Sequence, residues 1–208
     1  MTSGTNWRIP NTDRWILALV WLGLTGTVWA EPSMALESLM RQLAAVTQVE
    51  AGYREVVESQ LLQQPISTSG HLLYRAPDRL DKTSDRGDSI RIEGETLTLV
   101  QGREQTRIAI ADQPALQTLI SALRATFAGD LDRLRTDYLL ALQPHAEGWV
   151  LDLTPRERRF LTLFEHIRIQ GQGDRIDSLE VQEGNGDRRT LYLSDQRILT
   201  GESAGQTR

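Results

Sequence analysis

The sequence predicts an α+β fold: an incomplete antiparallel β-barrel, or half-barrel, of about ten strands that curls around amphipathic helices and can enclose a hydrophobic cavity. Apolar and polar residues alternate over most of residues 53–194, which is the period of strands, and turn residues break the alternation. Apolar residues recur at helical spacing over 33–47 and 113–129. Two helices cannot cover both faces of a large sheet, so the simplest packing curls the sheet around them.

The first thirty residues predict a secretory signal peptide. Arg8 and Arg14 precede the apolar run WILALVWLGLTG, and Val28 and Ala30 occupy the small-residue positions before a cleavage site. A retained membrane anchor is the alternative, although the run is shorter than the roughly 20 apolar residues that a spanning helix needs. We therefore expect cleavage after Ala30, a periplasmic location and one soluble domain over 31–208.

An amphipathic helix over about 33–47 is the first element expected after the leader, and it begins next to Pro32. From Tyr53 the period of the apolar residues changes to two, and Gly94 supplies the tight turn of a hairpin. The strands of this half are expected at 53–62, 71–76, 79–84, 89–101 (the hairpin) and 104–110.

The middle of the chain is predicted to be helical over 113–129, where Pro114 suits the first turn and Gly129 the end. A short helical continuation is expected over 130–138. Turn-rich segments then separate a second group of strands. These are expected at 138–143, 148–153, 166–170, 175–182 and 188–194, and the tail 195–208 is expected to be frayed.

Composition excludes several classes of function. The chain has no Cys, so it has no thiol nucleophile, no disulfide and no site for a lipid-modified cysteine. Its net charge of −5 argues against nucleic acid as a partner and against simple adhesion to anionic lipid. An exported chain of this kind must draw its stability from its hydrophobic core.

The sequence contains no strong motif for a metal site or a catalytic site. The three histidines, His71, His145 and His166, lack the short spacing of metal ligands, so no metal site is expected. The sequence contains no G-x-S-x-G nucleophile elbow, and its carboxylates cluster in turns, where solvated acids are common. We therefore predict no catalytic residue and no cofactor.

What remains is a large apolar surface on the sheet faces without an accompanying polar constellation. The candidate lining residues are Tyr74, Ile90, Ile92, Leu97, Leu99, Leu140, Trp149 and Leu151. A dry core and a cavity for an acyl chain are both compatible with this pattern.

The order and spacing of several segments resemble a known family. They are the signal peptide, the first helix, YREVVESQ, the G-x-L-x-Y strand that leads into YRAPDRLDK, SIRIEGETLTLV, GWVLDLTP and IRIQGQGDRIDSLEVQ. Together these segments resemble the LolA-type outer-membrane lipoprotein carriers over most of residues 35–194. The strength of the match lies in the order of the elements.

The resemblance implies a soluble, monomeric periplasmic chaperone that shields the acyl chains of a lipoprotein, or of a related lipid, between the inner and outer membranes. Its partners would be an inner-membrane donor complex and an outer-membrane acceptor. The resemblance implies no catalysis and favours the cavity over the dry core. The chain ends sooner after its last strand than such carriers do, so its cargo is expected to be a lipoprotein or another lipid.

Members of the family place an arginine before the proline, where it holds the lid by hydrogen bonds to helix carbonyls. Here Ala76 precedes Pro77, and Arg75 lies one position earlier. One position reverses the direction of a side chain on a strand. The resemblance therefore makes Arg75 the candidate gate residue, with Arg79 as second choice, and surface ion pairs are the alternative role for both.

Two other classes of function are retained. Related half-barrels act as envelope sensors that detect lipoproteins and signal through a partner, but a sensor is expected to carry a second domain or an anchor. An envelope hydrolase would need Ser, His and acidic side chains that converge inside the cavity.

Overall fold

The computed structural model describes residues 32–145 and 148–201. Its main element is an eleven-stranded antiparallel sheet in the order β6-β5-β4-β3-β2-β1-β11-β10-β9-β8-β7. The strands are β1 (Val46–Glu58), β2 (Ile66–Arg75), β3 (Arg79–Ser84), β4 (Ser89–Glu93), β5 (Thr96–Gln101), β6 (Glu104–Ala109), β7 (Tyr138–His145), β8 (Gly148–Pro155), β9 (Phe164–Gln172), β10 (Arg175–Glu183) and β11 (Arg188–Thr200). Because β6 and β7 are separate edges, the sheet is open, and the large antiparallel sheet predicted from the sequence is confirmed.

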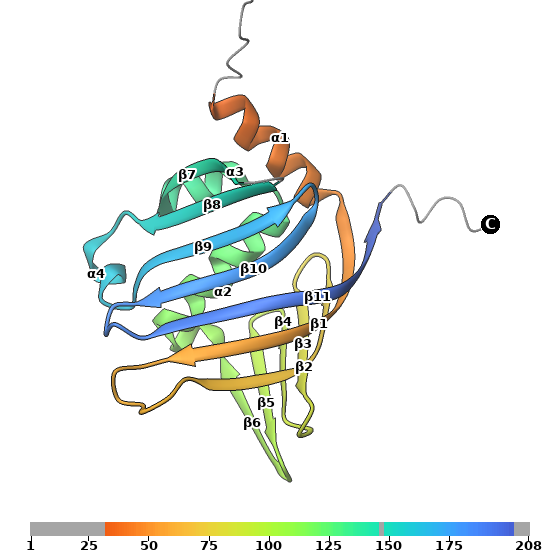
Figure 1. The fold of residues 1–208 in the computed structure, drawn as a ribbon, viewed down its shortest axis with the longest axis vertical. Helices are drawn as coiled ribbons and strands as arrows, with labels where there is room; N and C mark the ends of the chain where they lie inside the picture. Colours follow the sequence, from red (N-terminus) through yellow and green to blue (C-terminus); the bar gives the residue numbers. More distant parts are fainter. Residues whose placement is uncertain (1–31, 146–147, 202–208) are drawn as a thin grey trace, which may run out of the picture.

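The helices of the described residues are α1 (Pro32–Ala44), the 3₁₀ helix η1 (Ile110–Asp112), α2 (Pro114–Phe127), α3 (Leu131–Asp137) and α4 (Arg158–Leu161). Figure 1 shows α2 behind the sheet and α1 at one end of it, beside the start of β1. We call the sheet face that packs against α2 the inner face, and the opposite one the outer face. None of these helices is long and apolar enough to cross a membrane.

Period-two alternation directs the apolar side chains of the strands to the inner face. Leu151, Leu153 and Ile167 have no exposed surface, and they pack with α1, α2 and α3 in the largest hydrophobic cluster. A second cluster joins β1 to β2, and a third joins β4 and β5 to α2 through Ile120. The inner face therefore forms the core.

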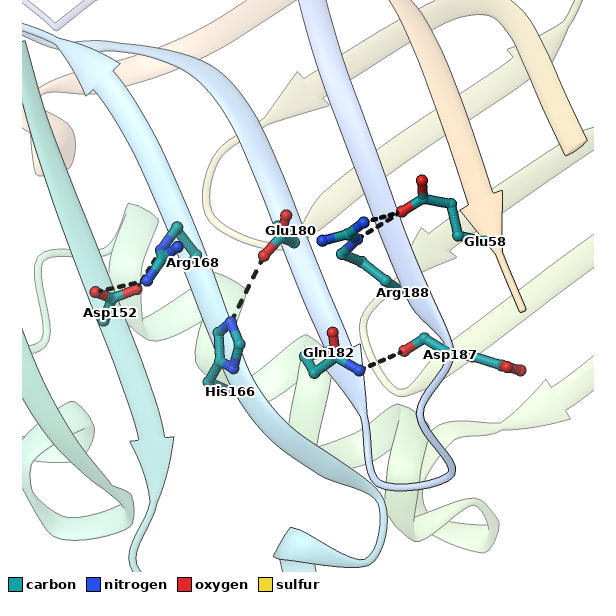
Figure 2. A network of polar contacts seen from close by, with 8 residues as sticks. All are labelled: Glu58, Asp152, His166, Arg168, Glu180, Gln182, Asp187 and Arg188. Carbon is teal, nitrogen blue, oxygen red and sulfur yellow. Dashed lines mark hydrogen bonds and ion pairs between the residues drawn. The ribbon is translucent and has the colours of Figure 1, made fainter. Parts of the chain in front are cut away.

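The outer face carries a row of polar contacts across β8, β9, β10, β11 and β1, shown in Figure 2 with the helices lying behind the sheet. The contacts are Asp152–Arg168 (2.7 Å), His166–Glu180 (3.6 Å), Arg188–Glu58 (2.5 Å) and Gln182 to the Asp187 carbonyl (3.2 Å). These side chains occupy the positions between the core residues. The alternation that fills the core thus also gives the sheet a solvated back.

The close approach of α1 and α2 depends on a glycine. Gly129 follows α2 with φ of 64°, and a Cβ there would lie 2.7 Å from the carbonyl oxygen of Met40 and 2.8 Å from the Cβ of Ala44. A side chain at this position would push the two helices apart. Gly129 ends α2, as the sequence predicts, and also lets α1 cover the end of α2.

The first helix ends earlier than predicted. α1 stops at Ala44, and β1 already begins at Val46, which pairs with Thr200 and is almost fully buried. β-branched residues at 46 and 47 favour a strand over a helix, and pairing with β11 stabilises the strand. The expected strand at 53–62 is correspondingly the second half of β1, which ends at Glu58.

Two further expectations differ from the structure. Residues 195–200, predicted to be frayed, continue β11, because this strand pairs with β1 as far as Thr200. The connection after β8, predicted to consist of turns, contains the short helix α4. The predicted signal peptide, its cleavage after Ala30 and the last seven residues of the tail lie outside the described residues.

Candidate functional site

A small apolar cavity lies between the C-terminal half of α2 and the middle of the inner face. Its volume is about 70 Å³. Strands β1 and β2 contribute Val49, Leu72 and Tyr74, and α2 contributes Leu123 and Phe127. We call this space the main cavity.

Strand register explains why these residues meet. Val49 is paired with Tyr74 in the β1–β2 ladder, and Tyr53 is paired with Leu193 in the β1–β11 ladder. Residues two apart on one strand share a face, so Leu191 and Leu193 both reach the main cavity. The wall of the cavity is therefore built from alternate positions of neighbouring strands.

The polar residues of the main cavity are few, and two of them are hydrogen-bonded to the backbone. The hydroxyl of Thr126 donates to the Ala122 carbonyl at 2.8 Å, and the amide of Gln196 donates to the Ile176 carbonyl at 2.9 Å. Asp174 lies in the β9–β10 turn at one end. The lining thus offers apolar contact and no converging Ser, His and acid groups among the described residues.

A second, smaller cavity of about 30 Å³ shares an aromatic pair, Tyr74 and Phe127, with the main cavity. The rings of Tyr74 and Phe127 are stacked with centroids 4.5 Å apart and an interplanar angle of 23°. Ile92 and Ile120 form part of the apolar wall of this second cavity. Burial, and to a lesser extent Asp78, raises the pKa of the Tyr74 phenol, so this ring stays neutral.

Helix α2 is linked to the sheet by polar contacts near both of its ends. The guanidinium of Arg124 donates through Nη2 to the Gly94 carbonyl, and its Nη1 lies 3.3 Å from Oε1 of Glu95. Near the other end, the hydroxyl of Tyr138 donates to the Thr118 carbonyl at 3.1 Å. Burial is the main cause that raises the pKa of Tyr138 to about 12.

The predicted lining residues are distributed over several parts of the inner face. Tyr74 lines both cavities, and Ile92 lines the second one. The others pack in the core beside them: Ile90, Leu97 and Leu99 in the β4–β5 cluster, and Leu140, Trp149 and Leu151 in the largest cluster. The sequence did not point to β1 and β11, which supply Val49, Leu191 and Leu193 to the main cavity.

The two predicted gate arginines lie on the outer side of the sheet. Arg75 follows the inner-face residue Tyr74, and Arg79 precedes the inner-face residue Leu80. Successive side chains of a strand point to opposite faces, so both arginines leave their strands on the outer face. Arg75 donates to Gln48 at 3.3 Å, and Arg79 donates to Asp81 at 2.8 Å. Neither has a hydrogen bond to a helix carbonyl among the described residues.

Asp81 takes part in a surface network rather than a gate. Burial alone would raise the pKa of this carboxyl group, but hydrogen bonds from Arg91 and Arg79 outweigh burial and lower it. The two arginines therefore have a structural partner on the outer face. The alternative role given to Arg79, a surface ion pair, is the one that its contacts support.

The arginine that joins a helix to the sheet is Arg124, which sequence reasoning missed. Its main partner is a backbone carbonyl in the turn at Gly94, where φ is 53°. No side-chain pattern reveals a backbone acceptor. The sequence contains both partners, an arginine in the helix and a Glu-Gly-Glu turn, but it does not show that they face each other.

Comparison with known families decides the classification. The family model described as "Outer membrane lipoprotein carrier protein LolA-like" matches residues 30–201, which is most of the chain. The chain belongs to this LolA-like family. The resemblance found in the sequence is therefore confirmed, and no curated protein matches this LolA-like chain.

The solved structures that are similar to this LolA-like protein are distant from it in sequence. A LolA superfamily protein from Nitrosomonas europaea is 11% identical with a TM-score of 0.41, over 79% of this chain and 93% of the other. A putative outer membrane lipoprotein-sorting protein domain from Vibrio parahaemolyticus gives 12% and 0.43, over 82% and 94%. MucB, in the MucA/MucB complex from Pseudomonas aeruginosa, gives 12% and 0.38, over 79% and 57%. At these sequence identities and TM-scores, the ligands of those proteins cannot be assigned to this chain.

Proposed function

We propose that this LolA-like protein is a periplasmic carrier that shields the acyl chains of a lipoprotein, or of another lipid, between the inner and outer membranes. The observation that carries the proposal is the main cavity, an apolar space closed by Leu43 of α1 and by Leu123 and Phe127 of α2. Each methylene buried in such a space contributes about 0.8 kcal/mol. An acyl chain therefore gains enough from burial to bind without specific polar contacts.

The volume of the main cavity indicates how loading works. Ligand-filled pockets measure roughly 300–1,000 Å³, whereas the main cavity measures about 70 Å³. The ladder hydrogen bonds hold the sheet wall together, while α2 is packed through side chains and a few polar contacts. We infer that α1 and α2 form a lid that moves away from the sheet when an acyl chain enters.

The decisive experiment compares two leucines of the same strand. Leu193 lines the main cavity, whereas Leu199 is 50% exposed and does not. Titration of the purified protein with a fluorescent hexadecanoyl probe should show saturable binding near one equivalent. Leu193→Gln should weaken binding at least tenfold, and Leu199→Gln should leave it unchanged. Saturable binding that both variants retain would exclude the main cavity as the site, and absence of binding to the native protein would contradict the carrier function.

Trp149 provides a second readout. Its indole Nε1 donates to the Gly173 carbonyl at 3.0 Å, next to Asp174 at the end of the main cavity. Four of the five tryptophans of the sequence lie at positions 7, 15, 21 and 29, within the predicted leader. In protein without the leader, entry of the probe should therefore change the emission of Trp149. Addition of the probe's solvent alone should leave this emission unchanged.

A further inference from the structure

The two cavities are neighbours, and the stacked rings of Tyr74 and Phe127 belong to the lining of both. The main and second cavities share Tyr74, Leu80, Leu123 and Phe127 as lining residues. Phe127 belongs to α2, so a displacement of this helix from the sheet would carry its ring away from Tyr74. The two spaces would then become one apolar channel, long and narrow, with the second cavity at its end.

That end of the channel has more charged lining residues than the main cavity, which has Asp174. Arg79, Arg124 and Asp78 line the second cavity together with its apolar residues. Arg79 is already paired with Asp81 and lies 3.8 Å from Glu93. Arg124 is the cation with unused hydrogen-bonding capacity.

The unused group is the Nε of Arg124, which is buried and has no hydrogen-bond partner among the residues that the structure describes. A buried donor without a partner is costly. Another nitrogen of the same guanidinium, Nη1, already faces a carboxylate, because Glu95 lies 3.3 Å from it. Glu95 is 75% exposed, so it is held weakly and a competitor can displace it.

A carboxylate matches the side edge of a guanidinium, where the Nε–H and one N–H of Nη2 point the same way. In Arg124 the Nε is free, and Nη2 has a second hydrogen besides the one that it donates to Gly94. We propose that Arg124 binds the carboxylate of a single-chain fatty acid, whose alkyl chain runs past Phe127 into the main cavity. This inference rests on the proposed function, because it needs an acyl chain in the main cavity. Two carboxylates oppose it: Asp78 in the lining of the second cavity and Glu95 beside the guanidinium.

The test compares two ligands that differ only in the charge of the head: hexadecanoate and methyl hexadecanoate. Each is titrated by displacement of the fluorescent hexadecanoyl probe at pH 8, into the native protein and two variants. The native protein should bind the acid at least tenfold more tightly than the ester. Arg124→Gln should abolish this ratio, and Glu95→Gln should raise it severalfold, because the competing carboxylate is removed.

The ratio of the two affinities separates head recognition from movement of the lid. Since Arg124 also links α2 to Gly94, its replacement changes the affinity for both ligands to the same extent if only the lid is affected. Equal binding of acid and ester by the native protein would overturn the fatty-acid site and leave the carrier function standing. So would an unchanged ratio in Glu95→Gln, a variant at an exposed position that should fold normally. Failure of both ligands to bind would instead contradict the carrier function.

Discussion

Replacement of Arg124 by Met tests whether α2 is the movable part of the molecule. The substitution keeps an unbranched apolar stem but removes the donor to Gly94 and the ion pair with Glu95. A hydrogen bond from a charged group contributes about 1.5–3 kcal/mol, and an ion pair with a carboxylate as exposed as Glu95 contributes close to nothing. Removal of the buried, unpartnered Nε returns about 1 kcal/mol.

The net loss is therefore about 0.5–2 kcal/mol, and it should fall on the attachment of α2 rather than on the sheet. This loss corresponds to an increase of about 2- to 30-fold in the population in which α2 has detached. Amide hydrogen exchange measures that population directly. The amides of Ala122–Phe127 should exchange faster in Arg124→Met, while the paired amides of β8 and β9 should keep their rates.

Glu95→Gln is the matched control, because it removes the ion pair and leaves the bond to Gly94 in place. Its effect on the exchange of α2 should stay below about twofold. The reasoning is refuted if α2 exchanges at the native rate in Arg124→Met. It is also refuted if β8 and β9 accelerate as much as α2, because the helix and the sheet would then open as one unit.

Three further predictions concern Gly70, Tyr138 and Phe127. Gly70→Ala should cost more than about 2 kcal/mol of stability in urea unfolding, since its Cβ would lie 2.0 Å from the Thr83 carbonyl oxygen. Tyr138→Phe should cost about 1 kcal/mol at pH 7, for the lost bond to Thr118, and the advantage of Tyr138 should vanish between pH 10 and 12. Phe127→Ala should join the two cavities, so that the variant is less stable to urea but binds longer acyl probes more tightly than the native protein.

The controls for these predictions use the same strands or the same assay. Ser67→Ala, at an exposed position of β2, should change stability by less than about 0.5 kcal/mol, and an equally small effect of Gly70→Ala would contradict the packing argument. For Tyr138, the sign follows from a folded-state pKa that is raised above 10.0. The stabilisation is complete below pH 10 and is lost as pH rises toward 12. A constant difference from the Phe variant across that range would count against it. An unchanged chain-length preference in Phe127→Ala would show that the rings do not separate the cavities.

The fold was largely predictable because its main signal is local. Alternation of apolar and polar residues marks a strand with one buried face, and the inner face of β8 and β9 carries Leu151, Leu153 and Ile167 at the expected spacing. The prediction that the tail is frayed was wrong for residues 195–200, and the reason is non-local. Residues 195–200 carry a weak alternation, and they are ordered because β1, about 150 residues earlier, offers a partner.

The candidate site was less predictable because its position depends on register. Leu140 and Leu193 look alike in the sequence, yet only Leu193 reaches the main cavity, since β11 lies beside β1 in the middle of the sheet and β7 lies at its edge. The arginine that joins α2 to the sheet could not be predicted for a related reason. Arg75 was judged by its neighbour Pro77, whereas Arg124 acts on a carbonyl that is thirty residues away in the chain.

The open sheet has a mechanical consequence. Each of its ladders would lose several hydrogen bonds if two strands moved apart, so the sheet is the stiff part of the molecule. The free edges β6 and β7 allow its curvature to adjust without breaking any ladder, as a closed cylinder could not. A ligand of larger volume would therefore be accommodated by a small change in sheet curvature and by movement of the helices, while the pairing of the strands stays the same.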